Sequence, residues 1–510
     1  YELRPADHLW GTKTLDCQAK IRKELGEPRA RLAMIGPGGE KLIRFACVIN
    51  DVKHAAGRTG LGAVMGSKNL KAVAARGKAA VPVADEDGVR DLARWMGQNW
   101  KDRAWGMHEL GTSGGLTGLS ASGALPTRNF QDGQFEGAEK ISGEAMRDTI
   151  LIDRGGCYAC PINCKRVCKV DDDDYQVDPD YGGPEYETMG AFGSNCGVDD
   201  VRAVAKANEY CNAYSLDTIS AGMAVSFAME CYENGILTKE DTGGLDLRFG
   251  NGPAMVEMTR MICEREGLGD LLAEGPTRAA KVIGKGADAY VIDVKGQPFP
   301  MHECRTRHGQ ALGYAVSPTG ADHMHNIWDG GLANDPVPDG LQSFGTYESV
   351  PETELNVNKV RAYKMQSNWT WLGNALGCCA FLPWSHDQTI DIVRTITGWQ
   401  TNLWELLKIG ERSVTLARVF NMREGLTAIV SHRSGENEMP FEADFSVGTG
   451  VGQVKIGSVS LPIALGLLAM MYPVLAKVRY SQIGEIATDR KLMVTSLVLN
   501  WVIGPALMFA

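Results

Sequence analysis

The chain has 510 residues, a formal net charge of −10 and 44 % hydrophobic side chains. A chain of this length is expected to form about two to four domains, and its negative charge argues against a nucleic-acid partner. Its 13 cysteines are an odd number, and no stretch near the start has the pattern of a secretory signal. These features predict a cytoplasmic, reducing environment in which cysteines serve as ligands rather than disulfides.

The first segment, residues 1–86, combines short apolar runs with glycine-rich turns. One amphipathic helix is expected within residues 1–30. Short strands are then expected at residues 31–35 and 42–49, separated by a glycine cluster at 36–39. This alternation predicts a small β domain.

A second glycine-rich stretch follows these strands and carries two cations, its main members being Arg58, Gly60, Gly62, Gly66 and Lys68. Backbone N–H groups freed by glycine, together with the two cations, would suit a phosphate or another anion. The spacing is neither that of a P-loop nor that of the dinucleotide fingerprint. A plain glycine-rich turn between strands is the alternative.

The central motif is a run of closely spaced cysteines, namely Cys157, Cys160, Cys164 and Cys168. A cubane iron–sulfur cluster needs four thiolates, so three local ones would require a fourth from elsewhere in the chain. The adjacent pair Cys378 and Cys379 supplies the best remote candidates. A zinc site and buried unreactive cysteines are the alternatives, although zinc sites usually pair two short ligand spacings.

Helical patterns dominate residues 87–445, and one long helix is expected to open at Asp199 and Asp200 because acids favour a helix N-terminus. A polar stretch that contains His302 is followed by His323 and His325. A metal bound by the last two is disfavoured, since residues two apart point to opposite faces of a strand. Hydrogen-bonded structural histidines are the alternative.

The C-terminal segment differs from the rest in composition. Residues 460–476 and 492–510 are two apolar runs, joined by a segment that contains Arg479, Arg490 and Lys491. Each run approaches the ~20 residues that a membrane helix needs, and a basic connection is typical of a cytoplasmic loop. The pattern predicts a membrane hairpin over residues 452–510. A buried helical hairpin of the preceding part is the alternative.

Four stretches taken in order resemble the aldehyde ferredoxin oxidoreductase family over residues 1 to about 440. Residues 58–73 resemble its pterin-binding signature, and residues 157–164 its cluster motif. Residues 183–188 resemble its acidic active-site stretch, and residues 421–425 a motif near its C-terminal end. The family's first hundred or so residues have no counterpart, so we expect the chain to be truncated at its N-terminus.

The family also repeats an Asp-x-x-Gly-Leu-Asp/Cys element, once for each pterin. The first copy is matched by Asn212, Ser215, Leu216 and Asp217, and the second by Asn374, Gly377, Cys378 and Cys379. Both leading aspartates are asparagine here, so hydrogen bonds to a pterin amine would lack charge assistance. The last position of the second copy selects Cys379 over Cys378 as the fourth cluster ligand.

The resemblance implies a tungsten or molybdenum bis-pyranopterin, one 4Fe–4S cluster and magnesium bridging the pterin phosphates. It implies oxidation of an aldehyde to a carboxylate, with electrons passing to ferredoxin or another low-potential carrier, in a chain able to form a homodimer. Glu187 and His323 are the candidates for proton handling, and Glu185 replaces Glu187 if the alignment shifts by two. His302 takes the place of a residue that lines the substrate pocket.

We therefore expect an α+β chain in which a β-sheet pterin-binding remnant, residues 1–86, precedes two mainly helical domains. These domains are expected at residues 87–292 and 293–445, followed by a pair of transmembrane helices within residues 452–510. The segment from about residue 452 resembles the start of an arsenite-efflux permease. An alternative function is therefore a membrane-tethered or transporter-associated protein whose N-terminal part is a binding module.

Overall fold

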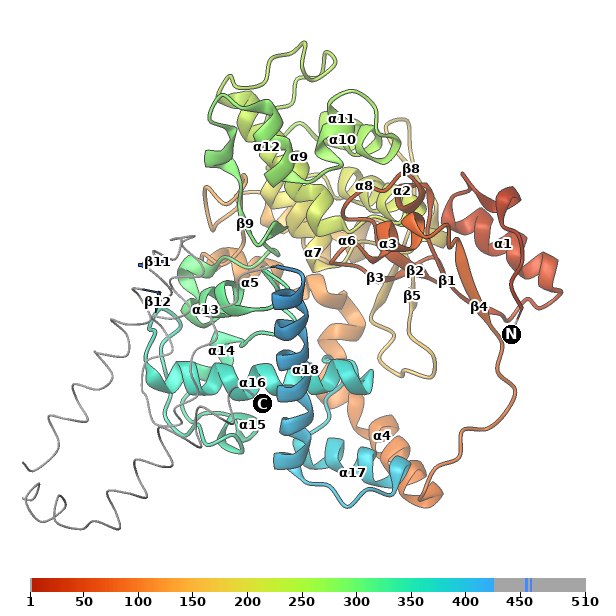
Figure 1. Ribbon diagram of the computed structural model, residues 1–510, viewed down its shortest axis with the longest axis vertical. Coiled ribbons are helices and arrows are strands. Elements are labelled where there is room, and N and C mark those ends of the chain that lie inside the picture. The colour runs from red at the N-terminus through yellow and green to blue at the C-terminus, as the bar shows by residue number, and fades with distance from the viewer. Residues whose placement is uncertain (1, 426–454, 457–458, 461–510) are drawn as a thin grey trace, which may run out of the picture. The chain divides into compact units, whose positions relative to one another are not determined.

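The computed structural model describes residues 2–425 and the two short strands β11 (Lys455–Ile456) and β12 (Val459–Ser460). The chain divides into two compact units, Tyr1–Gly448 and Thr449–Ala510. Figure 1 shows the first unit as a mixture of helices and short strands, in agreement with the predicted α+β class. Within the described residues, no helix combines the length and apolar character needed to span a membrane. Both predicted spans lie outside those residues.

The N-terminal segment forms a four-stranded antiparallel sheet in the order β3-β2-β1-β4, built from β1 (Arg31–Met34), β2 (Val48–Asn50), β3 (His54–Ala56) and β4 (Ala72–Ala75). The predicted helix before it is α1 (Thr14–Leu25), which ends at Gly26 in a left-handed conformation. Of the predicted strand over residues 42–49, only residues 48 and 49 are confirmed, as the start of β2. Leu42 has a φ of 55° and belongs to a turn, because the short helix α2 (Pro37–Glu40) occupies the glycine cluster.

The second glycine-rich stretch forms a helix, α3 (Leu61–Ser67), instead of an open loop. Added Cβ atoms at Gly60, Gly62 and Gly66 would each collide with a backbone carbonyl. The carbonyl oxygens they would meet are those of Arg44, Cys47 and Gly39 respectively. These glycines therefore permit α3 to pack directly against the 36–47 backbone, which is a structural reason for glycine at each position.

The cysteine motif lies in the turn of a hairpin formed by β5 (Leu151–Gly155) and β6 (Lys165–Cys168). The long helix α4 (Glu86–Leu110) packs beside this turn through Trp100 and Met96, which contact Ile162, Cys160 and Cys164 in one apolar cluster. The hairpin and α4 together hold the three thiols in one place.

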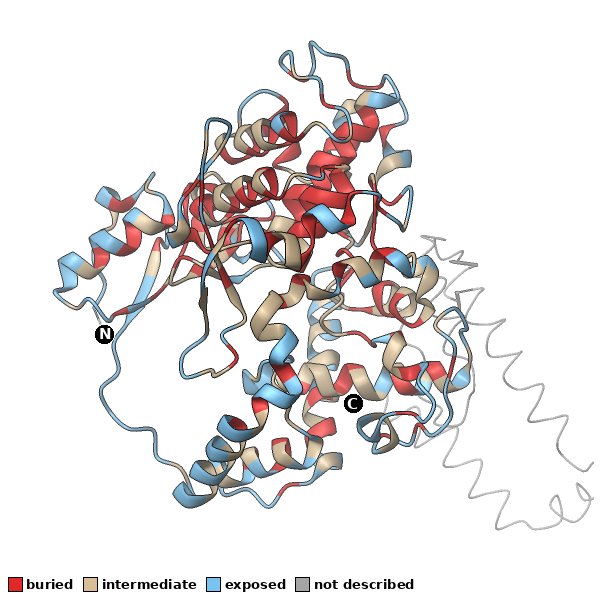
Figure 2. Ribbon diagram, turned by 180° about the vertical axis from the view of Figure 1, so that it is seen from behind, coloured by how far each residue is buried: buried red, intermediate tan, exposed pale blue. Residues whose placement is uncertain are grey.

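The largest core lies among the helices α8 (Val201–Tyr214), α9 (Thr218–Glu233) and α10 (Gly252–Glu264). The predicted helix opening is confirmed, since the Asp200 side chain caps α8 by accepting from Arg202 N–H. Figure 2 shows that α9 is buried along almost its whole length. A helix that is apolar on all sides belongs in a core, so α9 provides a rigid base for the site described below.

A second helical region is built on α16 (Val357–Leu376) and α18 (Leu403–Arg423), which cross each other in Figure 1. Gly410 of α18 permits the crossing, because a Cβ there would collide with the Asn368 carbonyl. The helix α17 (His386–Thr397) joins them and begins with a capping box at Ser385.

The remaining helices are short: α5 (Leu116–Ala121), α6 (Gly143–Thr149), α7 (Tyr186–Thr188), α11 (Leu268–Leu272), α12 (Pro276–Ile283), α13 (His308–Val316), α14 (Asp329–Leu332) and α15 (Asp339–Gln342). The remaining strands form two-stranded ladders: β7 (Val170–Asp171) with β8 (Gln176–Val177), and β9 (Asp293–Val294) with β10 (Gln297–Pro298). Of these, α7, α13 and the β9–β10 turn frame the site.

Candidate active site

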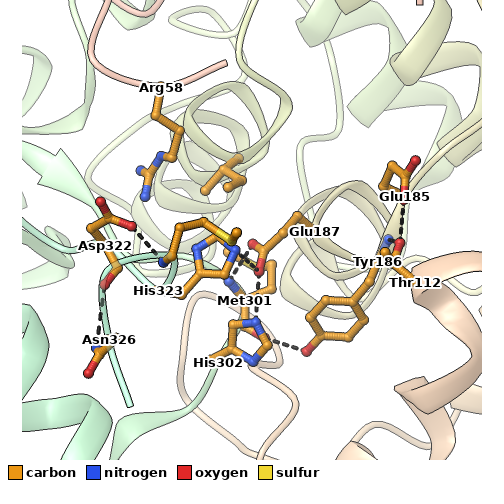
Figure 3. Close-up of polar contacts among 12 residues, drawn as sticks. Arg58, Thr112, Glu185, Tyr186, Glu187, Met301, His302, Asp322, His323 and Asn326 are labelled. Atoms are coloured by element: carbon orange, nitrogen blue, oxygen red, sulfur yellow. Dashed lines mark hydrogen bonds and ion pairs between the residues drawn. The ribbon is translucent and has the colours of Figure 1, made fainter. Parts of the chain in front are cut away.

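Three buried ionisable side chains converge from distant parts of the chain. His302 Nε2 lies 2.9 Å from Glu187 Oε1, and His323 Nε2 lies 3.5 Å from the same oxygen. Figure 3 shows the carboxylate between the two imidazole rings, whose centroids are 5.2 Å apart. Trp328 packs edge-on against His302 at 5.0 Å. The sequence predicted Glu187 and His323 as proton-handling residues and His302 as a pocket residue, and the fold brings all three together.

Local hydrogen bonds fix the position of Glu187. The Met301 backbone N–H donates to Glu187 Oε2 at 2.8 Å, and the Tyr186 hydroxyl donates to the Met301 carbonyl. Gly190 lets this segment approach closely, because a Cβ there would come within 2.6 Å of the Met301 side chain. The carboxylate is therefore held by the same residue that precedes His302.

The charges of this site follow from burial and from the pairing. Burial alone would raise the pKa of Glu187, but the neighbouring His323 and His302 outweigh it and hold that pKa at about 2. Burial lowers the pKa of His323, although Glu187 opposes the shift. At neutral pH Glu187 is therefore an ionised carboxylate and His323 a neutral imidazole, and both can accept protons.

Several buried atoms of the site have no hydrogen-bond partner in the described protein: Glu187 Oε1, His302 Nδ1 and His323 Nδ1. The 2.9 Å contact between Glu187 and His302 is thus an ion-pair distance without good hydrogen-bond geometry. Buried polar atoms normally have partners, so the site is suited to a polar ligand. In residues 2–425 these three side chains are also the one set whose His, Cys or carboxylate ligand atoms lie within 4.8 Å of one another.

Arg58 links the N-terminal segment to this site. Its guanidinium donates to the carbonyls of Ala321 at 2.8 Å and Pro298 at 2.6 Å, and its Nε lies 3.4 Å from Asp217 Oδ2. Figure 3 places Arg58 beside Asp322 and His323. Lys68, in contrast, is exposed at the C-terminal end of α3. Of the two predicted anion-binding cations, only Arg58 reaches the site.

The first repeat copy joins the N-terminal segment to α9. Ser215 has a left-handed φ of 62°, and its hydroxyl accepts from Gly36 N–H at 2.8 Å. Leu216 pairs with Ala46 in an isolated β-bridge. Asp217 caps α9 by accepting from Ile219 and Ser220 N–H. The Asn212 amide donates to the Tyr181 carbonyl at 2.8 Å, so this asparagine also has a structural contact.

The second copy reaches the His323 loop through a single polar contact. The Asn374 amide nitrogen lies 2.8 Å from His325 Nε2 and donates to the Thr370 carbonyl at 3.0 Å. A group that donates to a carbonyl must be the NH₂ of the amide, so His325 Nε2 is the acceptor. His325 Nδ1 then carries the proton and donates to Asp322 Oδ2 at 2.5 Å. Asn374 and Asp322 together fix the orientation of the His325 ring.

His323 and His325 do point to different partners, but the reason given by the sequence was wrong. They lie in a turn rather than in a strand. His323 contacts Glu187, whereas His325 contacts Asp322 and stacks on Trp371 with centroids 4.0 Å apart. The turn, not a pleat, separates the two rings.

The cysteine loop is held by Arg166, whose guanidinium donates to the carbonyls of Asn163, Cys164, His108 and Glu109. Cys157 is exposed, whereas Cys160 and Cys164 are partly buried. Cys168 is fully buried in β6, where Gly183 packs against it, and burial raises its pKa to about 12. Cys168 is thus set apart from the three loop cysteines by its complete burial in β6.

Of the remote cysteine pair, Cys379 contributes to the pKa shifts of the loop thiols. Burial raises the pKa of Cys164 to about 11, and the charges of Glu185 and Cys379 add to the rise. Burial also raises the pKa of Cys157, and Cys379 contributes there too. Cys379 therefore lies within electrostatic range of the loop thiols, as its place in the repeat predicted.

Two features near this loop were missed from the sequence. Lys165 Nζ forms an ion pair with Glu185 Oε1 at 2.8 Å, and Thr112 donates to the other carboxylate oxygen at 2.5 Å. Glu185 therefore lies beside the cysteine loop, whereas Glu187 lies with the two histidines. Trp95 stacks on Trp384 at 5.5 Å beside the same loop. A basic residue directly after Cys164 was a visible signal for the ion pair.

Comparisons with known proteins now bear on this arrangement. Residues 91–442 match the family model "Aldehyde ferredoxin oxidoreductase, domains 2 & 3", and residues 1–77 match the N-terminal domain of the same family. The tungsten-containing aldehyde ferredoxin oxidoreductase of Thermococcus kodakarensis is 37 % identical over 435 residues, which are 83 % of this chain and 68 % of the relative. That of Pyrococcus furiosus is 35 % identical over 435 residues, with the same shares of both chains covered.

A solved structure supports the fold. The active-site complex BamBC of benzoyl coenzyme A reductase matches with a TM-score of 0.66 and 24 % identity, covering 83 % of this chain and 70 % of that one. At this identity the likeness concerns the fold alone.

The chain belongs to the aldehyde ferredoxin oxidoreductase family, and it is an oxidoreductase.

The C-terminal segment has relatives of a different kind. Residues 464–510 match the Sodium Bile acid symporter family. A stretch of 60 residues is 67 % identical to the arsenical-resistance protein Acr3 of Corynebacterium glutamicum, covering 12 % of this chain and 16 % of that protein. The predicted resemblance to an arsenite permease is confirmed at the level of sequence.

Proposed function

We propose that residues 1–445 oxidise an aldehyde to a carboxylate and pass the electrons through a 4Fe–4S cluster to ferredoxin or another low-potential carrier. The observation that supports this most is the buried Glu187–His302–His323 group beside Arg58. It lies where the family's pterin segment and acidic stretch meet. The cofactors that accompany membership of this family are a tungsten or molybdenum bis-pyranopterin and a 4Fe–4S cluster.

The chain offers a coherent set of residues to hold these groups. Arg58, the 212–217 segment and the 374–378 segment would bind the pterins, with magnesium as an accompanying cation. The cluster ligands would be Cys157, Cys160, Cys164 and Cys379. The unpaired buried atoms of His302 and His323, and the electrostatic link between Cys379 and the loop thiols, support this assignment.

Aldehyde oxidation consumes water and releases protons: R–CHO + H₂O gives R–COO⁻, three protons and two electrons. The metal–pterin group supplies the two-electron chemistry when it is bound. Glu187, ionised at neutral pH, would accept a proton from the hydrated aldehyde, and neutral His323 would relay it. His302 would hold the carboxylate in place, and Trp328 would shield this side of the group from water.

The two electrons must leave one at a time when the acceptor is ferredoxin, because such carriers take single electrons. The cysteine loop is suited to this step, since Cys157 and Tyr158 are exposed and a carrier could approach them. The ion pair of Lys165 with Glu185 connects this loop to the segment that bears Glu187. Two oxidised carriers would be reduced for each aldehyde.

The decisive experiment is elemental analysis of the purified full chain combined with an aldehyde panel and a viologen acceptor. We expect tungsten or molybdenum, about four iron atoms per chain, and aldehyde-dependent reduction of the viologen. A chain loaded with metal that reduces no viologen with any aldehyde would contradict the proposal.

We further propose that the enzyme part, divided at residues 86 and 292 as predicted, lies in the cytoplasm and forms a homodimer. Residues 452–510 would insert into a membrane, which the match to Acr3 supports. A transporter component is the second candidate function. Arsenite uptake by vesicles that contain the full chain would favour it, whereas no uptake would leave the segment as a tether.

A further inference from the structure

One face of α13 borders the Glu187 site. Gln310 and Tyr314 are one turn apart on this helix, and Arg307 is its N-cap residue, three positions before Gln310. Residues at these spacings share a helix face. The Tyr314 hydroxyl lies 3.3 Å from the His302 carbonyl, to which it donates. The face that carries Arg307 and Gln310 is therefore turned toward His302.

Arg307 is a largely buried cation with an unpaired buried nitrogen. Its side chain is 13 % exposed, and its buried Nε has no hydrogen-bond partner among the described residues. Its nearest acid is Glu352, with Oε2 at 3.5 Å from Nε. Burial raises the pKa of Tyr186, and the charge of Arg307 opposes that shift, so the guanidinium acts on the residue that precedes Glu187.

Gln310 is fully buried, and both polar atoms of its side-chain amide lack partners. Its backbone N–H donates to Asp329 Oδ2 at 2.9 Å, which fixes this turn of α13. A buried amide with neither atom paired is rare in a native protein. On the face shared with Tyr314, such an amide is available to a ligand.

Other cations of this region are already committed. Arg58 donates to two backbone carbonyls, and Arg305 donates to the Phe130 carbonyl and to Glu303. Lys359 forms a fully buried ion pair with Asp329 at 2.8 Å. Each of these three cations has close acceptors in the protein, whereas the contact that Arg307 makes with Glu352 is longer, at 3.5 Å, and leaves guanidinium N–H groups available to an anion.

We propose that Arg307 and Gln310 form a subsite for a carboxylate of the substrate, so that the chain prefers aldehydes carrying a second, anionic group. The planar guanidinium matches a carboxylate with two parallel N–H donors, and the Gln310 amide adds a third. This proposal rests on the proposed aldehyde oxidation and names its substrate class. The aldehyde end would lie at Glu187 and the carboxylate at the start of α13.

The test compares 4-oxobutanoate with pentanal, a neutral aldehyde of similar length, in the full holoenzyme. We expect Arg307→Gln to lower kcat/KM for 4-oxobutanoate by about 10- to 100-fold, mainly through KM, because a charge-assisted contact is lost. Pentanal should change by less than about threefold. Arg305→Gln is the matched control: its side chain is 59 % exposed and paired with Glu303, and it should leave both substrates unchanged.

A binding measurement gives a second readout that does not depend on turnover. Succinate, the product of 4-oxobutanoate, should raise the Tm of the wild type, and this rise should be lost in Arg307→Gln and reduced in Gln310→Met. Arg307→Lys keeps the positive charge but lacks the planar pair of N–H donors. Provided that Arg307→Gln is folded and loaded with metal, Arg307→Lys should recover part of the succinate-induced rise in Tm that Arg307→Gln loses.

Three results would overturn the proposal. The first is a wild-type protein that prefers pentanal to 4-oxobutanoate. The second is an equal loss of activity on both aldehydes in Arg307→Gln, because Arg307 would then have a structural role only. A stronger preference for glyceraldehyde 3-phosphate than for 4-oxobutanoate would assign the subsite to phosphate instead of carboxylate. Failure of the aldehyde chemistry itself would look different, since fully metal-loaded wild type would then oxidise neither 4-oxobutanoate nor pentanal.

Discussion

The two copies of the repeated element, residues 212–217 and 374–379, are held in very different ways. The first copy is buried and bonded on all sides: Ser215 and Asp217 are nearly inaccessible, and both join α9 to the N-terminal sheet region. In the second copy, most residues are exposed, and Asn374 reaches the His323 loop through His325 alone. Similar sequence elements can therefore be buried between packed segments in one place and largely exposed in another.

The largest expected effect separates the two cysteines of the second copy. Cys379→Ala should abolish the 4Fe–4S signal in electron paramagnetic resonance and lower iron content, because a cubane needs four thiolates. Cys378→Ala is the matched control and should retain the signal. The reverse outcome would shift the ligand by one residue and place Cys378, not Cys379, beside the loop.

Removing the buried joint of the first copy should cost the most stability. Asp217→Ala deletes the cap of α9 and leaves the Arg58 guanidinium without its acid, so the free energy of unfolding should fall by about 2–4 kcal/mol. Chemical denaturation of the metal-free protein measures it. Asn374→Ala should cost less than about 1 kcal/mol, because its side chain is exposed. Equal losses would refute the contrast between the copies.

Lowering the pH should reduce the folding stability contributed by His323 and Glu187 in two steps. The folded pKa of His323 lies below its ordinary value of 6.5, so the unfolded chain takes up the proton first and stability falls as pH drops below 6.5. Glu187 stabilises the fold above its ordinary pKa of 4.5, and that contribution is lost as pH falls toward about 2. Denaturant midpoints at several pH values measure both. His323→Asn should flatten the first step; an unchanged pH profile would contradict it.

Restoring the acid of the second copy should have a smaller effect. Asn374→Asp would offer a charge-assisted acceptor to a pterin amine, so the purified protein should retain more pterin, while its stability changes by less than about 0.5 kcal/mol. Pterin content after extended dialysis is the measurement. Asn358→Asp, at the partly buried start of α16, serves as a charge control. Equal retention in both variants would leave Asn374 without a pterin role.

The smallest effect is expected from the C-terminal segment, which belongs to neither copy. Deleting residues 452–510 should leave iron and pterin content unchanged, because these residues fall in a separate compact unit from residue 449 onward. The same deletion should raise the yield obtained without detergent, since it removes both apolar runs. A loss of cofactor on deletion would make the segment part of the enzyme.

The sequence by itself determined the elements whose signal is local. The spacing of Cys157, Cys160 and Cys164 predicted a common centre, and the strand, helix and cap patterns predicted α1, β1 and α8. The resemblance assigned Arg58 to a pterin-binding stretch and Glu187 and His323 to proton handling. Such signals depend on neighbours a few residues apart or on a fixed order of motifs, so they can be recognised from the sequence alone.

Only the tertiary structure decided which side chains meet. It separated Glu185, paired with Lys165, from Glu187, paired with His302 and His323. It gave Gly62 a packing role and left Lys68 exposed, although both lie in one signature. It also left Arg307 Nε and the Gln310 side-chain amide without hydrogen-bond partners among the described residues. Contacts between residues that are far apart in the sequence, such as Glu187 with His302, depend on how the elements pack. No local sequence pattern encodes them.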